Sequence, residues 1–282
     1  MPSTVAAFKD GTTLLRENPV LLLAGLFLAA GNQLSLLGDA VSRPLLSAAV
    51  SLVGFLVFPF VLGGFVGMVQ TALRNGTPSL GTFVTAGRTH YVRLLLGSLL
   101  FALLVLGVAI GVGMGSFALG VGVIAAGSAD GTIAFATMVG SAVVWLLFVL
   151  AVILFLQFYD VAIVVEESGV TDAFRRSVAL VRTNLASVVG FSVLWGLLFN
   201  LVLLPEYLVE SSLTATSLTA SVPFGGRLPF EGGVPVVDGL SLGLLIAVGS
   251  VVSVVGLSYL YTVYTAFYVQ LIAESPEPKS KR

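Results

Sequence analysis

Long, uninterrupted runs of apolar residues dominate this chain and alternate with short polar segments. Residues 143–165, for example, are apolar on every side except at Gln157 and Asp160. Runs of 18 or more apolar residues are typical of bilayer-spanning helices. Only helices and closed barrels satisfy every backbone group in lipid. A barrel would show segments of about ten residues that alternate apolar and polar positions. The runs therefore predict an all-α membrane protein.

The runs predict six transmembrane helices in a single membrane domain over residues 1–273, followed by a short charged tail over 274–282. Several runs exceed the roughly 20 residues that a bilayer requires, so we expect tilting, projection or a kink, for which Pro59 is a candidate. The first run is expected to be retained, because Leu28 stands where a signal-peptide cleavage site near residues 29–31 would need a small residue. The predicted spans are 19–37, 44–73, 91–126, 132–165, 185–204 and 240–273.

The distribution of basic residues predicts the orientation. Of the 13 Lys and Arg residues, only Arg43 and Arg227 fall on the side opposite to the chain termini. Positively charged loops stay in the cytoplasm, so both termini are expected there, in a multi-pass protein of the cell membrane. The residues predicted on the cytoplasmic side are Lys9, Arg16, Arg74, Arg88, Arg93, Arg175, Arg176, Arg182, Lys279, Lys281 and Arg282.

Composition excludes several classes of protein. The chain is 57% hydrophobic and 10% charged, with a mean hydropathy of +1.07, whereas soluble domains carry about 25% charged residues. A net charge of −1 offers no basic surface for nucleic acid. The absence of cysteine and the single histidine, His90, argue against a zinc site. We therefore expect no metal, no cofactor and no nucleic-acid partner.

The cytoplasmic segments share a pattern that predicts internal repetition. Ala7 and Arg16 are nine residues apart and precede Asn18, and residues 173, 182 and 184 repeat this spacing before the fifth span. A weaker third copy covers 83–93. In the copy near residue 180, Phe174, Val178, Val181 and Leu185 share one helical face. The pattern predicts three units, each an interfacial amphipathic helix followed by a helical hairpin, although generic juxtamembrane helices would also give it.

Residues 164–177, with the sequence VVEESGVTDAFRRS, and residues 181–184, VRTN, carry a family resemblance. With the overall layout, they resemble a broad family of prokaryotic six-helix integral membrane proteins that includes archaeal members of uncharacterised function. That family is similar to the membrane domain attached to some glycerophosphodiester phosphodiesterases. The resemblance implies the six-helix fold. It implies no catalysis, because that membrane domain has no established active site to carry over.

Asp160 is the principal candidate site residue. A carboxylate at mid-bilayer costs about 2.5–3.5 kcal/mol on insertion scales and marks a functional site by default. Asp160 is also only six residues from Glu166, so it could lie at the cytoplasmic interface and pair with an arginine. Other polar residues in the spans either join helices through hydrogen bonds or line a polar cavity. They are Asn32, Gln33, Gln70, Gln157, Asn200 and Gln270.

A second candidate site is a charged cytoplasmic cluster at the entry to the fifth span. It is either a solvated, locally paired face or a surface that docks a partner or lipid head groups. Its members are Glu166, Glu167, Arg175, Arg176 and Arg182.

Three other features bear on architecture. Glycines spaced by four residues are expected to allow close helix contacts, at Gly63 and Gly67 and at Gly107, Gly111 and Gly115. Tyr261, Tyr264 and Tyr268 share one face of the last span, as an interfacial belt or packing stripe. The outer loop, residues 205–239, is expected to lack regular structure.

These features favour a non-enzymatic membrane protein that serves as a scaffold or a subunit of an assembly, with another membrane protein or further copies of itself as partner. A transporter, permease or lipid-handling protein with a polar site near Asp160 is the alternative. An enzyme is not expected, because the chain shows no convergent acid, base or metal-binding groups. A polar cavity around Asp160 would favour transport, whereas solid packing would favour a scaffold.

Overall fold

The structure is a computed structural model that describes residues 4–40, 44–125, 131–214, 218–222, 226–230 and 239–274. Arg43 and residues 275–282 of the charged tail lie outside these ranges. The side chains of Asn32, Gln33 and Arg227 are also outside the described part of the chain. The described elements are α1 (Thr4–Glu17), α2 (Val20–Ala40), α3 (Pro44–Leu73), α4 (Leu80–Ala125), α5 (Gly131–Leu156), α6 (Tyr159–Val165), α7 (Val170–Thr183), α8 (Leu185–Thr214), β1 (Leu218–Val222), β2 (Gly226–Phe230) and α9 (Gly239–Glu274).

Five helical stretches of the described chain are long and apolar enough to cross a membrane, and α1 with α2 adds a sixth if that bent pair is counted. This number fits a multi-pass membrane protein. Both prolines of the long helices are accommodated, since α3 continues through Pro59 and α8 through Pro205. The five stretches are Ala48–Leu73, Leu80–Gly122, Phe135–Val165, Leu185–Val209 and Ile246–Glu274.

Asparagine residues end two of the short helices at a bend. The backbone N–H and side-chain amide of Asn18 both donate to the Leu14 carbonyl, and α2 leaves α1 at 108°. Asn184 makes the same pair of bonds to the Leu180 carbonyl between α7 and α8. These bonds satisfy a terminal carbonyl that the ending helix leaves free. The matched spacing seen in the sequence thus corresponds to a shared helix-ending device.

The third predicted short helix does not exist as a separate element. We expected an interfacial segment over 83–93 and a span beginning at residue 91, but α4 is one continuous helix of 46 residues. Arg93 stands where the other two segments have Asn, and its guanidinium Nη1 donates to the Glu167 carbonyl at 2.9 Å. No side-chain cap therefore ends the helix there, and α4 continues unbroken.

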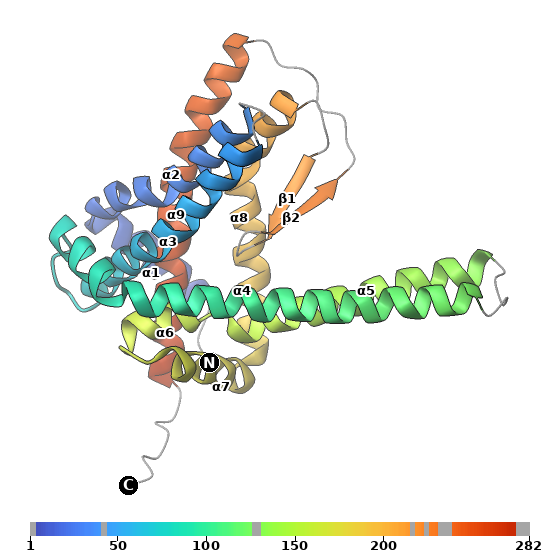
Figure 1. Ribbon diagram of the computed structural model, residues 1–282. Coiled ribbons are helices and arrows are strands. Elements are labelled where there is room, and N and C mark those ends of the chain that lie inside the picture. Colours follow the sequence, from blue (N-terminus) through green and yellow to red (C-terminus); the bar gives the residue numbers. More distant parts are fainter. Residues whose placement is uncertain are drawn as a thin grey trace, which may run out of the picture.

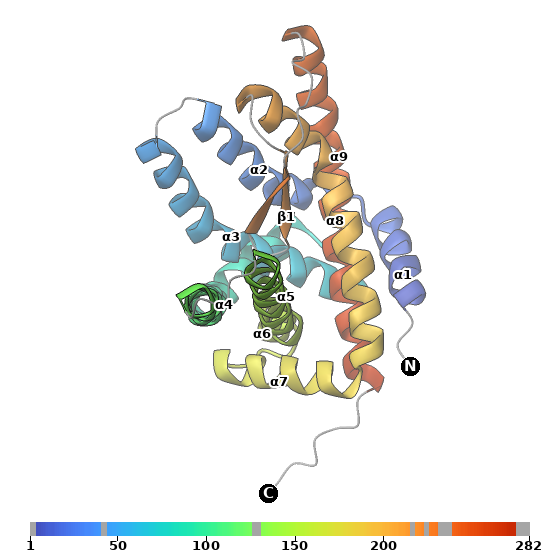
Figure 2. The ribbon, with the colours of Figure 1, turned by 90° about the vertical axis from the view of Figure 1, so that its right-hand side faces the viewer.

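The α9 helix is the centre of the bundle. Its residues from Thr262 to Tyr268 are buried on every side, and it contacts α1, α2, α3, α6 and α8. Figures 1 and 2 show α8 and α9 running side by side, with α1, α7 and the end of α9 near one end of the molecule. The end of α2 and the starts of α3 and α9 lie near the other end.

The predicted interfacial segments each pack on the second long helix of the preceding predicted unit. In α1, a Cβ added to Gly11 would lie 2.5 Å from Val263 of α9. The start of α4 packs on α3, where Gly64 meets Phe83. In α7, Phe174 stacks on Tyr159 at the start of α6, with ring centroids 4.8 Å apart. The apolar face of α7 is therefore covered by protein.

The α4–α5 hairpin stands away from this bundle and runs across the direction of α8 and α9 (Figures 1 and 2). Trp145 Nε1 donates to the Ala109 carbonyl at 2.7 Å and joins its two helices. Its outer part is bare, and Phe117 is 75% exposed.

The prediction of close glycine contacts is confirmed for Gly63 and Gly67, which face α4. It is wrong for Gly107, Gly111 and Gly115, because no heavy atom beyond the local helix lies within 4 Å of a Cβ built at any of them. The outer part of the hairpin packs against no other helix, so these glycines have nothing to contact.

The expectation that residues 205–239 lack regular structure is wrong in part. The α8 helix extends to Thr214, and β1 and β2 pair as an antiparallel ribbon in which Ala220 faces Leu228. The strand β1 lies against α8. The remaining segments, 215–217, 223–225 and 231–238, are outside the described residues.

Candidate functional site

The fourth predicted span is broken next to Asp160. The α5 helix ends at Leu156 and α6 begins at Tyr159. Ser177 of α7 bridges the break, because its Oγ donates to the Phe155 carbonyl at 2.8 Å and accepts from the Phe158 N–H at 3.2 Å. Backbone groups freed by a broken helix need such partners in an apolar interior. The break is thus held by a specific contact with α7.

Asp160 lies inside the protein, away from its surface. The residue is only 3% exposed to solvent. Oδ1 accepts from the Val161 N–H at 2.8 Å and from the Tyr264 hydroxyl at 3.0 Å. The ion pairs among the described residues involve Glu166 and Asp172, so the predicted arginine pairing of Asp160 is not observed.

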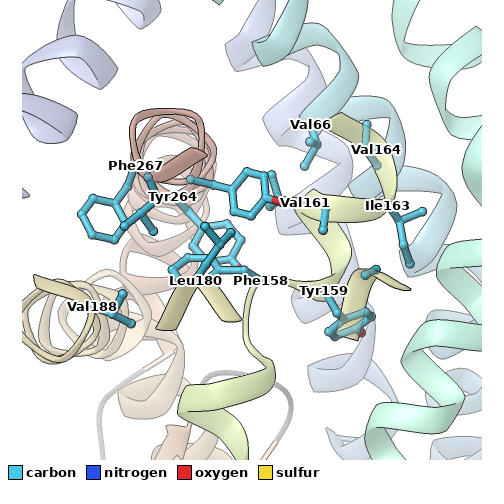
Figure 3. Packing of buried hydrophobic residues seen from close by; sticks show 14 of the residues in the cluster. Val66, Phe158, Tyr159, Val161, Ile163, Val164, Leu180, Val188, Tyr264 and Phe267 are labelled. Carbon is cyan, nitrogen blue, oxygen red and sulfur yellow. The ribbon is translucent and has the colours of Figure 1, made fainter. Parts of the chain in front are cut away.

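Aromatic rings fill the space around this carboxylate. Phe158 stacks on Tyr264 with ring centroids 5.4 Å apart, and Phe267 lies 6.2 Å from Phe158. Figure 3 shows these side chains packed between α6 and α9, with Leu180 and Val188 closing the cluster. The Tyr264 hydroxyl also donates to the Gln157 carbonyl. This is solid packing around a hydrogen-bonded acid.

The other predicted polar residues are only partly gathered here. Gln157 joins the site, where its Oε1 accepts from Ser192 at 3.0 Å and its buried Nε2 has no partner among the described residues. Gln70 donates to the Val165 carbonyl at the far end of α6. Asn200 bonds to Gly196 within α8 and lies apart. Gln270 donates to Asp10 and ties α9 to α1.

The cytoplasmic cluster divides into an inward half and an outward half. Glu166 accepts from Arg176 at 3.1 Å and from the Tyr268 hydroxyl. Glu167 has a left-handed backbone with φ of 54°, and its carbonyl accepts from Arg93. By contrast, the side chains of Arg175 and Asp172 are 84% and 71% exposed and 3.9 Å apart. Arg182 is also exposed. Arg175 and Arg182 are therefore the exposed arginines of this cluster, and the side chain of Glu167 is exposed as well.

Several residues that matter here were not identified as site residues from the sequence. Tyr264 was grouped with a packing stripe, and Ser177 and Ser192 carried no signal because single serines are common in apolar helices. Glu206 is a second buried acid, to which Ser253 donates at 2.5 Å. Its position beside Pro205, within the apolar stretch Leu185–Val209, could have identified it.

The polar groups of this site are arranged to hold helices together. Within the described residues, no group of three or more His, Cys, Asp or Glu side chains could hold a metal ion. The polar groups at the break bond mainly to one another and join α5, α6, α7, α8 and α9.

Comparisons with known proteins bear on the whole chain. Neither the curated proteins nor the solved structures include a match to it. A domain of unknown function, DUF7847, matches residues 3–271, and the chain therefore belongs to that family.

Proposed function

We propose that this protein is a multi-pass cell-membrane protein that acts without catalysis, as a scaffold or a subunit of a membrane assembly. The observation that carries the proposal is the packing around Asp160. Polar groups there bind one another, and aromatic rings fill the remaining space. An acid held in this way fixes helices in place, whereas a transport site needs room for a substrate.

The proposed orientation places both termini in the cytoplasm. It is supported by the gathering of α1, α7 and the end of α9 near one end of the molecule, since α1 and α7 carry exposed basic residues. Cytoplasmic segments are enriched in such residues. The outer surface of the bundle and hairpin would then be covered by the lipid bilayer.

A threefold repeat is supported by the packing of the interfacial segments. Each rests on the second helix of the preceding unit, and α1 closes the series on α9. Two of the three units also share the asparagine bend. The likeness to the membrane domain attached to some glycerophosphodiester phosphodiesterases remains a prediction from the sequence.

The partner of the proposed assembly is another membrane protein or a further copy of this chain. Arg175 and Arg182, which face outward from α7, are the residues on which we expect a cytoplasmic partner or anionic head groups to dock. The nearly neutral net charge gives no reason to expect nucleic acid.

Transport or lipid handling is the second candidate, and one observation favours it. Discontinuous helices with polar groups at the break are a feature of transporter binding sites. The α5–α6 break has Asp160 beside it and leaves Gln157 Nε2 unmatched. A buried N–H donor without a protein partner is able to donate to a water molecule or a ligand.

Native mass spectrometry of protein extracted gently from its own membrane tests the two candidates. A stoichiometric protein partner, lost in Arg175→Glu with Arg182→Glu and kept in the matched Thr171→Glu control, supports the assembly role. A retained small molecule or lipid that is lost in Asp160→Asn, and kept in Asp172→Asn, contradicts it in favour of transport. Bare monomers under all conditions also count against the assembly role.

A further inference from the structure

The helices α3 and α4 pack as antiparallel neighbours over only part of their length. Cβ atoms added to Gly63, Gly64 and Gly67 would meet Leu94, Phe83 and Ala86 of α4. The residue numbers of the paired positions add to about 150, as expected for two antiparallel helices of equal rise. After Leu94 of α4 the two helices separate, and Leu52 of α3 and Leu103 of α4 are about 60% exposed. The contact stops while both helices continue.

The separated part of α4 and its partner α5 cannot lie along a membrane surface. An interfacial helix needs one polar face and one apolar face. Among the candidate spans of the described chain, Leu80–Gly122 and Phe135–Val165 contain the two most hydrophobic 18-residue windows. Exposed apolar side chains cover successive positions of the hairpin, as at Leu146, Leu147 and Phe148. The hairpin therefore belongs inside the hydrocarbon.

The direction of the hairpin conflicts with that of α8 and α9 in one flat bilayer. Figure 2 shows α4 and α5 nearly end-on where α8 and α9 run lengthwise. Spanning helices tilt by no more than about 40° from the bilayer normal. Both groups cannot meet that limit at once in this arrangement. The hairpin is the part that can turn, because its contacts with the bundle are confined to its base, near Phe101 of α4 and at the last turn of α5.

We propose that, in the bilayer, the α4–α5 hairpin pivots about residues 94–101 and continues the antiparallel packing of α4 along the first half of α3. The inference rests on the proposed membrane location. The occupant of the exposed face of α3 is thus this chain's own hairpin. A straight hairpin from a second copy would not serve, since it would hold that copy's bundle crosswise to this one, outside the same bilayer.

The pivot has a residue-level cause. At the two equivalent junctions, Asn18 and Asn184 end the short helix and the chain bends. At the third, Arg93 bonds to the Glu167 carbonyl at an exposed site and leaves α4 unbroken. An exposed hydrogen bond of this kind is a weak constraint, because water competes for both of its partners. Insertion of an apolar hairpin of this length into lipid outweighs that constraint.

Cross-linking in native membranes tests the proposal, because the chain has no cysteine of its own. Because the residue numbers of paired positions on α3 and α4 add to about 150, the closed hairpin would place Leu103 opposite Ala48. Both side chains are exposed, so the variant with Leu103→Cys and Ala48→Cys should fold. We expect a disulfide within one chain on mild oxidation, read by peptide mapping. Gly11→Cys with Val263→Cys is the positive control, since a Cβ built at Gly11 would lie 3.4 Å from Val263 Cα and against its side chain. Leu103→Cys with Val251→Cys is the negative control.

Each other outcome overturns the proposal. A disulfide between two chains would show that a second copy of the protein, and not the chain's own hairpin, covers the exposed face of α3. No Leu103–Ala48 disulfide, with the positive control formed, would leave the hairpin open. Arg93→Asn should raise the cross-linked fraction and Arg93→Gln should not, and equal fractions would refute the pivot. Alkaline carbonate separates these failures from failure of the membrane location: release of the protein refutes the location, whereas retention without cross-linking refutes only the closure.

Discussion

Removal of the Tyr264 hydroxyl tests whether the Asp160 site serves stability. In Tyr264→Phe the ring still stacks on Phe158, but Asp160 Oδ1 loses one of its two donors, at 3.0 Å, and the Gln157 carbonyl loses a donor as well. A hydrogen bond to a charged group contributes about 1.5–3 kcal/mol, and interhelical bonds in membrane proteins reach about 1.7 kcal/mol. We therefore expect a loss of about 2 kcal/mol in the free energy of unfolding.

The assay is reversible unfolding in mixed micelles with increasing sodium dodecyl sulfate, followed by tryptophan fluorescence. The chain has two tryptophans, and Trp145→Phe leaves Trp195, whose ring centroid is 5.8 Å from that of Tyr264, as the reporter. Tyr91→Phe is the matched control, because it removes an exposed hydroxyl bonded to the Leu56 carbonyl. Its effect should stay within about 0.5 kcal/mol.

A double-mutant cycle isolates the bond to the carboxylate. In an Asp160→Ala background, which removes the acceptor, Tyr264→Phe should cost at least about 1 kcal/mol less than in the wild type, since contacting residues couple by about 0.5–3 kcal/mol. An equal cost in both backgrounds would mean that the hydroxyl acts only through Gln157. A cost indistinguishable from that of Tyr91→Phe would refute the structural role of the site.

Three further predictions concern other parts of the chain. Gly67→Leu should destabilise the protein by about 1–3 kcal/mol in the same unfolding assay, because the new Cβ would overlap Ala86, while Gly54→Leu, with open space around it, should change little. Glu167→Gly should raise stability by about 1 kcal/mol by relieving the left-handed φ of 54°, and a loss would show that its side chain matters more than its backbone. On intact cells, Ser221→Cys should react with an impermeant thiol reagent and Thr171→Cys only after permeabilisation; the reverse pattern would contradict the orientation.

Much of the fold could be predicted because apolar run length and helix periodicity are local properties. The last span, expected at 240–273, is found at Gly239–Glu274, and Phe174 and Val181 are both buried on one face of α7 as expected. Asp160 was identified because one charge in an apolar run is conspicuous at any depth. Local sequence sufficed wherever one element's own side chains determine its structure.

The remainder depends on contacts between distant segments. The backbone groups at the α5–α6 break are hydrogen-bonded by Ser177, some twenty residues later, so no feature of the apolar run itself predicted the break. The α4 helix continues past the position where the other two segments have asparagine, and here the residue is Arg93, in a pattern whose third copy was weak. The tyrosines of α9 became bonding partners of Asp160 and Glu166 only through folding.

The closure of α1 on α9 has a consequence for biosynthesis. The Tyr259 hydroxyl donates to the Phe8 carbonyl across 251 residues of sequence. At translation rates of about 5–20 residues per second, α1 emerges roughly 10–50 s before its partner. During that interval its apolar face is without a protein partner, although the membrane surface can shelter it. The order of synthesis thus makes the last helix the step that completes the bundle. A ribosome stalled before residue 240 would leave α1, α2, α3, α6 and α8 without the helix that joins them.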